Sequence, residues 1–197
     1  MKKYELTEET VIVSGKTLYR IRAVRDFGSV KAGDLGGYIE KEENLSHCGE
    51  AWVSDNAMVC GYAEVSDDAV VSGNAVVSGN ARVCGEALVC DNAEVYGNAK
   101  VSGNAKVSGK ACVCGDAEVS DTRHFFVQGP IGSRDGFVTF YRTKNNTVGV
   151  RCGCFSGSLQ EFVDRVEETH GGSRYEKEYK LAAELAKVCI RLEGESR

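Results

Sequence analysis

The residues best suited to chemistry form a glycine-rich loop in the C-terminal third of the chain. The loop Gly129-Pro-Ile-Gly-Ser-Arg134 offers free backbone N–H groups, a hydroxyl and a guanidinium, and such groups can hold an anion. The loop fits neither a Walker nor a Rossmann pattern. As its ligand we therefore expect a phosphorylated small molecule or a nucleotide. The predicted anion site comprises Gly132, Ser133, Arg134, Arg142, Arg151, His170 and Tyr179. The alternative is a hairpin loop whose arginines are solvated.

Two cysteine pairs are the next candidates. Cys112-Val-Cys114 and Cys152-Gly-Cys154 each have the i, i+2 spacing that places both thiols on one face of a strand. Four such thiols could bind zinc if the two strands met. Cys152 and Cys154 also share a face with the valines of their own strand, which favours core packing. We therefore predict no metal site and no cofactor.

A six-residue repeat must position these groups. Residues 51–122 divide into twelve hexads without insertion, with Ala in the first column and Val in the third column throughout. Ala and Val two residues apart point to one face of an extended segment, and the Gly or Asp of the fifth column favours a turn. Three hexads per turn give a coil of 18 residues, so the repeat predicts a parallel β-helix of about four coils.

The outward second column separates the flat sides of this helix. One side carries Trp52, Val70 and Leu88, and the next carries Met58 and Val76, whereas the third is charged throughout. Exposed apolar ladders usually mark a covered surface. We predict a dimer or trimer formed through Trp52, Met58, Val70, Val76 and Leu88. The chain's own terminal regions are the alternative cover.

The flanking segments have a different character, so three regions are expected: an N-terminal β cap (1–50), the β-helix (51–122) and a C-terminal α+β module (123–197). The cap contains a hairpin over residues 10–24, and residues 45–50 form a degenerate hexad with His47 in the valine column. The module contains strands at 125–128, 137–142 and 148–155, then two helices that begin with the capping boxes Ser158–Glu161 and Ser173–Glu176.

Composition and charge limit the cellular compartment and the classes of binding partner that we expect for this protein. The N-terminus lacks the apolar segment of a signal peptide, there is no apolar run of 18 residues, and nine cysteines favour a reducing cytoplasm. The net charge of −5 offers no general attraction to nucleic acid or to anionic membranes.

Several motifs carry a family resemblance that spans nearly the whole chain. The segments 24–37 and 44–46, followed by the hexads, resemble hexapeptide-repeat proteins of phages and prophages, often labelled transferases. The segments 129–134, 139–143, 152–157 and 169–171 are similar to a module common in phage proteins. The resemblance implies a left-handed coil, and acyltransferases of this fold use a histidine base. The hexads contain no histidine: His47, His124 and His170 all lie outside them.

These observations predict a mainly β protein without catalytic residues. The first hypothesis is a phage-type binding and scaffold protein that oligomerises through the β-helix and recognises a host component, such as a bacterial defence factor. The second is a sponge that binds a nucleotide signal at the Arg134 loop. The third is a hexapeptide-repeat acyltransferase. In each case we expect a cytoplasmic location in the phage-infected or lysogenic host.

Overall fold

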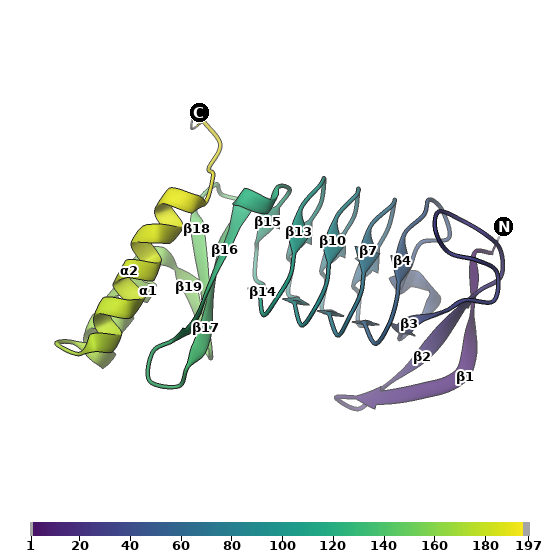
Figure 1. Cartoon of the computed structure of the whole chain (residues 1–197), viewed down its shortest axis with the longest axis horizontal. Helices are drawn as coiled ribbons and strands as arrows, with labels where there is room; N and C mark the ends of the chain where they lie inside the picture. Colours follow the sequence, from purple (N-terminus) through teal and green to yellow (C-terminus); the bar gives the residue numbers. More distant parts are fainter. Residues whose placement is uncertain (1, 195–197) are drawn as a thin grey trace.

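The hexads form a parallel β-solenoid, because each contributes one two-residue strand followed by a corner. The computed structural model describes residues 2–194, and the solenoid lies between a hairpin at one end and a mixed module at the other (Figure 1). The solenoid strands are β4 (Trp52–Val53), β5 (Met58–Val59), β6 (Glu64–Val65), β7 (Val70–Val71), β8 (Val76–Val77), β9 (Arg82–Val83), β10 (Leu88–Val89), β11 (Glu94–Val95), β12 (Lys100–Val101), β13 (Lys106–Val107), β14 (Cys112–Val113) and β15 (Glu118–Val119).

The strands stack into three parallel sheets with the predicted 18-residue register. In one sheet Leu88 pairs with Val70 on one side and with Lys106 on the other. The sheet orders β4-β7-β10-β13, β5-β8-β11-β14 and β6-β9-β12-β15 follow directly from three strands per coil. The mainly β solenoid fold is therefore confirmed.

A further coil precedes the regular hexads, which brings the solenoid to about five turns. Strand β3 (Leu35–Ile39) pairs with β5 so that Ile39 lies opposite Val59, and Leu45 bridges to Val65. Both spacings are 20 residues, because two extra residues fall between Leu45 and Val53. Leu45 therefore occupies the valine column, and the prediction that placed His47 there is wrong.

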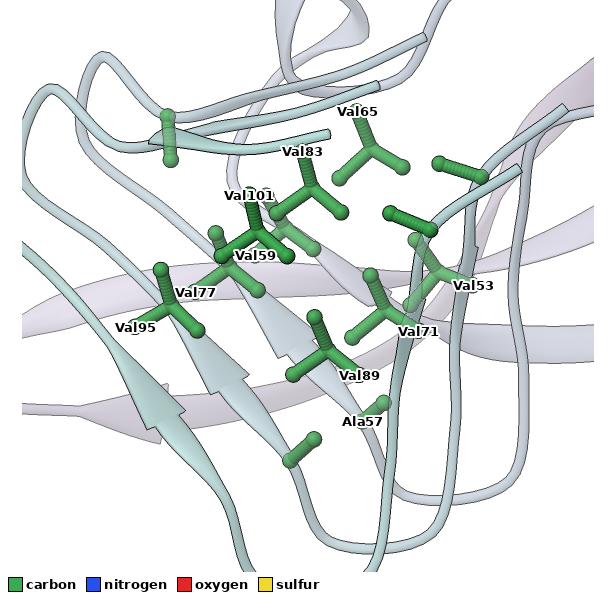
Figure 2. Packing of buried hydrophobic residues seen from close by; sticks show 14 of the residues in the cluster. Val53, Ala57, Val59, Val65, Val71, Val77, Val83, Val89, Val95 and Val101 are labelled. Atoms are coloured by element: carbon green, nitrogen blue, oxygen red, sulfur yellow. The ribbon is translucent and has the colours of Figure 1, made fainter. Parts of the chain in front are cut away.

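The interior of the solenoid consists of the Ala and Val columns. Every valine of the third column is fully buried, and every alanine of the first column is at most 2% exposed. Figure 2 shows the valines of successive coils stacked above one another, for example Val53, Val71 and Val89. Each buried valine contributes about 1.5–3 kcal/mol through removal of apolar surface from water. Larger side chains would not fit between three sheets this close together.

The corners explain why Gly and Asp share the fifth column. Asp55, Asp67 and Asp91 adopt left-handed backbone angles, with φ of 56°, 58° and 62°. Each carboxylate accepts a hydrogen bond of 2.9–3.0 Å from the N–H of the glycine one coil further on. An aspartate at a corner therefore satisfies a backbone donor of its neighbour, which offsets part of the conformational strain.

The N-terminal region closes the first end of the solenoid. Strands β1 (Tyr4–Val13) and β2 (Lys16–Ala23) form the predicted hairpin and extend the sheet of β3, while η1 (Glu42–Asn44) leads into the first coil. Lys3 is fully buried and donates to the carbonyls of Gly49 (3.4 Å) and Ala51 (2.7 Å). Burial lowers the pKa of Lys3 to about 8, and the charge of Arg25 acts in the same direction.

The C-terminal module packs a sheet between the solenoid and two helices (Figure 1). After η2 (Thr122–His124), strands β16 (Phe125–Ile131), β17 (Gly136–Arg142), β18 (Val148–Cys152) and β19 (Phe155–Ser158) form an antiparallel sheet. The predicted third strand is thus two strands, because the chain turns at Gly153, whose φ is +56°. Helices α1 (Leu159–His170) and α2 (Arg174–Cys189) cover the face away from the solenoid.

Only one of the two predicted capping boxes is complete. At α1, Ser158 and Glu161 bond to each other's backbone N–H groups. At α2, Ser173 accepts from the N–H of Glu176, but the Glu176 carboxylate accepts from Gly172 instead of Ser173. Ser158 and Ser173 are nevertheless the N-cap residues of the two helices, so the sequence placed both helix starts correctly.

The stacked corners give a direct test of the register. We expect Gly97→Ala to destabilise the protein more than Gly109→Ala. Both glycines have φ near +70°, but a Cβ at Gly97 would lie 2.9 Å from the backbone nitrogen of Gly115, whereas a Cβ at Gly109 meets nothing within 4 Å. The left-handed angle alone costs an alanine about 1–2 kcal/mol. Urea unfolding measures both losses, and equal losses would contradict the stacking.

Candidate binding surfaces

The last coil meets the C-terminal sheet through hydrogen bonds that continue the solenoid ladder. The hydroxyl oxygen of Thr139 accepts from the N–H of Cys112 at 2.9 Å, and Lys144 donates its backbone N–H to the carbonyl of Asp116. Tyr141 is 3% exposed and packs into the solenoid core. The module therefore covers donors that would otherwise be open at the end of the coil.

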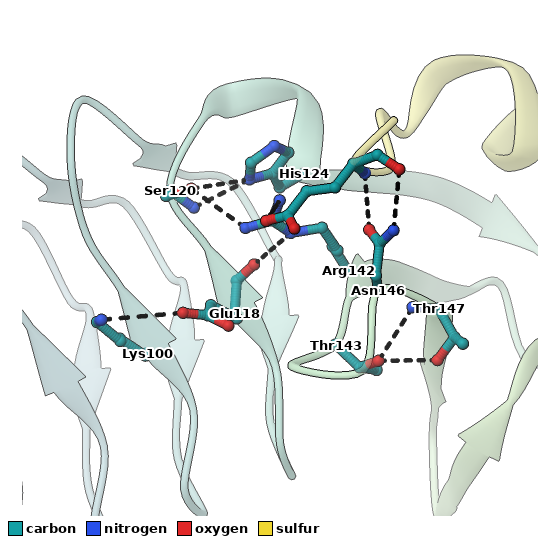
Figure 3. A network of polar contacts seen from close by, with 9 residues as sticks. Lys100, Glu118, Ser120, His124, Arg142, Thr143, Asn146 and Thr147 are labelled. Atoms are coloured by element: carbon teal, nitrogen blue, oxygen red, sulfur yellow. Dashed lines mark hydrogen bonds and ion pairs between the residues drawn. The ribbon is translucent and has the colours of Figure 1, made fainter. Parts of the chain in front are cut away.

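Arg142 fastens this junction (Figure 3). Its guanidinium donates to the carbonyl of Glu118 at 3.1 Å and to the hydroxyl of Ser120 at 3.2 Å, and it pairs with Glu193. His124 accepts from the N–H of Ser120, and burial followed by the charge of Arg142 lowers the pKa of His124. Arg142, a predicted anion ligand, is thus 6% exposed and engaged in holding two parts of the chain together.

A groove of about 420 Å³ opens beside the junction, between the face of β11 and β14 and the edge of the module. Lys110, Cys112, Phe137 and Arg151 are among the residues that line it. The Lys110 ammonium lies 4.8 Å from the ring centre of Phe137, and the Arg151 guanidinium lies 5.9 Å from that of Tyr96. The Glu94 carboxylate lines the same groove, so the groove carries charges of both signs.

The thiol of Cys112 lines this groove, and Cys114 follows two residues later in the chain. The thiol of Cys112 donates to the hydroxyl of Tyr96 at 3.3 Å. The sulfur of Cys114, 2% exposed, lies 3.4 Å from the hydroxyl of Tyr141 and 3.9 Å from that of Ser156. The neighbouring Cys112 thiol and these hydroxyls lower the pKa of Cys114, although burial opposes them. The proximity of Cys114, followed by burial, raises the pKa of Cys112.

The two cysteine pairs do not combine. Cys152 packs with the cluster between the sheet and the helices, as the sequence predicted. The same prediction is wrong for Cys154, which is exposed because the chain turns at Gly153. Cys112 and Cys114 face the junction instead. In the part of the chain that the structure describes, no three His, Cys, Asp or Glu side chains converge as a metal site.

The predicted anion site is distributed over three places. Gly132, Tyr179 and His170 do come together: a Cβ on Gly132 would overlap the Tyr179 hydroxyl, and the His170 and Tyr179 rings are 5.6 Å apart. The N–H of Gly132, however, donates to the Glu178 carboxylate at 2.8 Å, so the chain's own side chain takes the place of an external anion. Ser133 and Arg134 are exposed in the same turn, whereas Arg142 and Arg151 lie at the junction and at the groove.

The predicted association surface is partly covered by the chain itself. Trp52 is 6% exposed, because Phe27 and Tyr4 pack edge-on against its ring at 5.3 and 6.4 Å. This is the cover by a terminal region that the sequence left open as an alternative. The other four predicted residues remain half-exposed on two flat sides, namely Met58, Val70, Val76 and Leu88.

One apolar surface was missed by the sequence reasoning. Leu181, Leu185 and Val188 of α2 are 70%, 46% and 83% exposed, and their i, i+4, i+7 spacing places them in one stripe. The opposite face of α2 packs through the small residues Ala182, Ala183 and Ala186. The sequence did contain a signal for this surface, namely a second set of apolar residues with helical spacing at positions 181, 185 and 188. Cys189, at the end of the helix, is exposed as well.

Comparison with known proteins supports the repeat. A family model described as YdcK Beta solenoid repeat matches residues 63–79, which lie within the solenoid. No curated protein matches the chain. Together with the structure, the match identifies a repeat β-solenoid protein. None of the helices in the described part of the chain has the length and apolar character needed to cross a membrane.

We expect substitution of Thr139 at the junction to lower the free energy of unfolding more than a matched substitution at the surface does. Thr139→Val removes the acceptor of the Cys112 N–H while keeping the shape of a side chain that is 1% exposed. An unpaired donor at this interface costs about 1–3 kcal/mol, which urea unfolding measures. Thr147→Val, at an exposed position of the same sheet's hairpin, is the matched control and should cost much less. Equal effects would show that the Thr139 bond does not hold the junction.

Proposed function

We propose that this chain is a non-catalytic binding and scaffold protein whose C-terminal module recognises a partner protein through α2. The observation that carries the proposal is the exposed stripe of Leu181, Leu185 and Val188. Large aliphatic side chains at this exposure cost free energy in water, and contiguous ones usually mark an interaction surface. We refer to these three residues as the α2 stripe.

The form of the α2 stripe favours a helix of another protein as its occupant. The stripe is convex and follows one helix, so it matches the a and d spacing through which two helices pack. The neighbouring charges are satisfied within the helix: Lys187 pairs with Glu184, and Arg174 pairs with Glu178. The surface therefore offers apolar contact with little net charge, which suits the apolar face of an amphipathic helix.

The solenoid supplies the scaffold in this proposal. Each coil is hydrogen-bonded to the next, and the bonds of Thr139 and Arg142 hold the module against the last coil. The α2 stripe is thus presented at a fixed place relative to the flat solenoid faces. A partner bound there would be held at one end of an elongated, ordered body.

The resemblance to phage and prophage proteins suggests where the partner would come from. We propose a protein of the bacterial host, met in the cytoplasm, and a bacterial defence factor whose activity is blocked by binding is one such partner. A photocrosslinking residue at position 188 in host cells identifies it.

Substitution of the stripe tests the proposal once the crosslinked protein has been purified. Val188→Glu should weaken its binding at least ten-fold in calorimetry, because a charge would be buried in an apolar contact. Ile12→Glu is the control, since Ile12 is 73% exposed but lies in the β1–β2 hairpin. Both variants should keep the wild-type circular dichroism. Equal affinities of the two variants would reject the α2 stripe as the binding surface.

Self-association through the solenoid is a separate part of the proposal. Val70 and Leu88 are half-exposed on one flat side, and neighbouring coils stack them into a ladder that a second copy can cover. We expect Leu88→Asp to shift the protein towards the monomer in sedimentation equilibrium at micromolar concentration. Arg82→Asp, on the charged side, should leave the assembly unchanged. A wild-type protein that sediments as a monomer would rule out this association.

A further inference from the structure

The thiols of Cys112 and Cys114 share an environment that the solenoid cysteines on their own do not have. They lie two residues apart at β14 and point outwards from the last coil, where the C-terminal sheet covers them. Each sulfur contacts a tyrosine hydroxyl, from Tyr96 and Tyr141 respectively. Arg151 and Glu94 line the groove together with Cys112 and bring one charge of each sign to the same place.

We propose that Cys112 and Cys114 bind a monovalent soft metal ion, Cu(I), as a two-coordinate bis-thiolate site at the junction. Soft thiolate ligands select Cu(I) among the common metals of cells. The groove that Cys112 lines gives the ion a path to the sulfur of Cys112. The proposal does not depend on the α2 stripe or on self-association.

The separation of the two side chains fits a bridging metal better than a disulfide. Residues two apart on a strand are separated by about 6.5 Å along the chain, and their side chains run nearly parallel. A disulfide needs its Cβ atoms at about 3.8 Å and its sulfurs at about 2 Å. Two metal–sulfur bonds of about 2.3 Å each span roughly twice the sulfur separation of a disulfide, so the metal requires less distortion of β14.

The number of ligands favours a monovalent ion. Structural zinc takes four protein ligands, and among residues 2–194 no third His, Cys, Asp or Glu joins these two thiols. Two thiolates with one Cu(I) carry a net charge of −1, and the guanidinium of Arg151 and the carboxylate of Glu94 both line the groove beside Cys112.

The surrounding hydroxyls would support the bound sulfurs. Tyr141 and Ser156 lie within hydrogen-bonding reach of Cys114 and Tyr96 within reach of Cys112, and such contacts orient ligand sulfurs and tune their basicity. Binding releases both thiol protons to solvent: one Cu(I) ion and two thiols give the bis-thiolate anion and two H⁺.

Anaerobic titration of the full chain with Cu(I), against a competing Cu(I) chelator of known affinity, tests the site. The wild-type protein should retain one molar equivalent of Cu(I) in the presence of the chelator. Cys112→Ser and Cys114→Ser should each lose that equivalent. Cys84→Ser and Cys90→Ser should retain it, because those cysteines also point outwards from the solenoid but have no thiol two residues away. Circular dichroism of each variant checks that the fold is kept.

Substitution of Arg151 gives a second, independent test of the copper site. Arg151→Met should weaken Cu(I) binding about ten-fold, whereas Arg151→Lys, which keeps the charge, should lie close to the wild type. X-ray absorption of the loaded protein should show two sulfur neighbours and no further ligand. A wild type that withholds no copper, a Cys112→Ser/Cys114→Ser double variant that binds as the wild type does, or a copper shell of three or more ligands would each overturn the proposal.

Discussion

The structure depends on one constraint: the backbone donors and acceptors of each coil must be paired with those of the coil 18 residues away. This ladder fixes the Ala and Val columns inside, and it forces every corner to repeat at the same height. At three corners the carboxylate of an aspartate accepts from the N–H of the glycine in the next coil, as with Asp91 and Gly109. The ladder also has two open ends, and the remainder of the chain is arranged around closing them.

The two ends are closed by different means. At the first end the buried Lys3 and Tyr4 donate to carbonyls of the first coil. At the other end a strand of the module lies across the last coil, with Thr139 and Arg142 as the contacts. The second solution has a chemical consequence. Outward side chains that would face solvent on any other coil become enclosed, and this is how Cys112 and Cys114 come to lie among tyrosine hydroxyls.

The packing of the module determines what it leaves exposed. Helix α2 packs on the cluster formed with α1 and the sheet through small alanines, so its large aliphatic residues point to solvent. The glycine-rich loop shows the opposite outcome: its donor is taken up within the chain by Glu178. A protein of this shape therefore presents apolar surface on α2 and a groove with charges of both signs, while the loop that looked most like a ligand site is occupied by its own carboxylate.

The sequence alone determined the solenoid, because a period of six with invariant Ala and Val columns is satisfied only by stacked coils. Local signals also placed the hairpin and both helix starts. Tertiary structure decided what depends on residues far apart in the chain. The pairing of Leu45 with Val65 follows a 20-residue spacing that breaks the period, and Trp52 is covered by Phe27 from another segment. Arg142 bonds the carbonyl of a coil residue 24 positions away. No local pattern encodes these contacts, since they form only when the ends of the solenoid are closed.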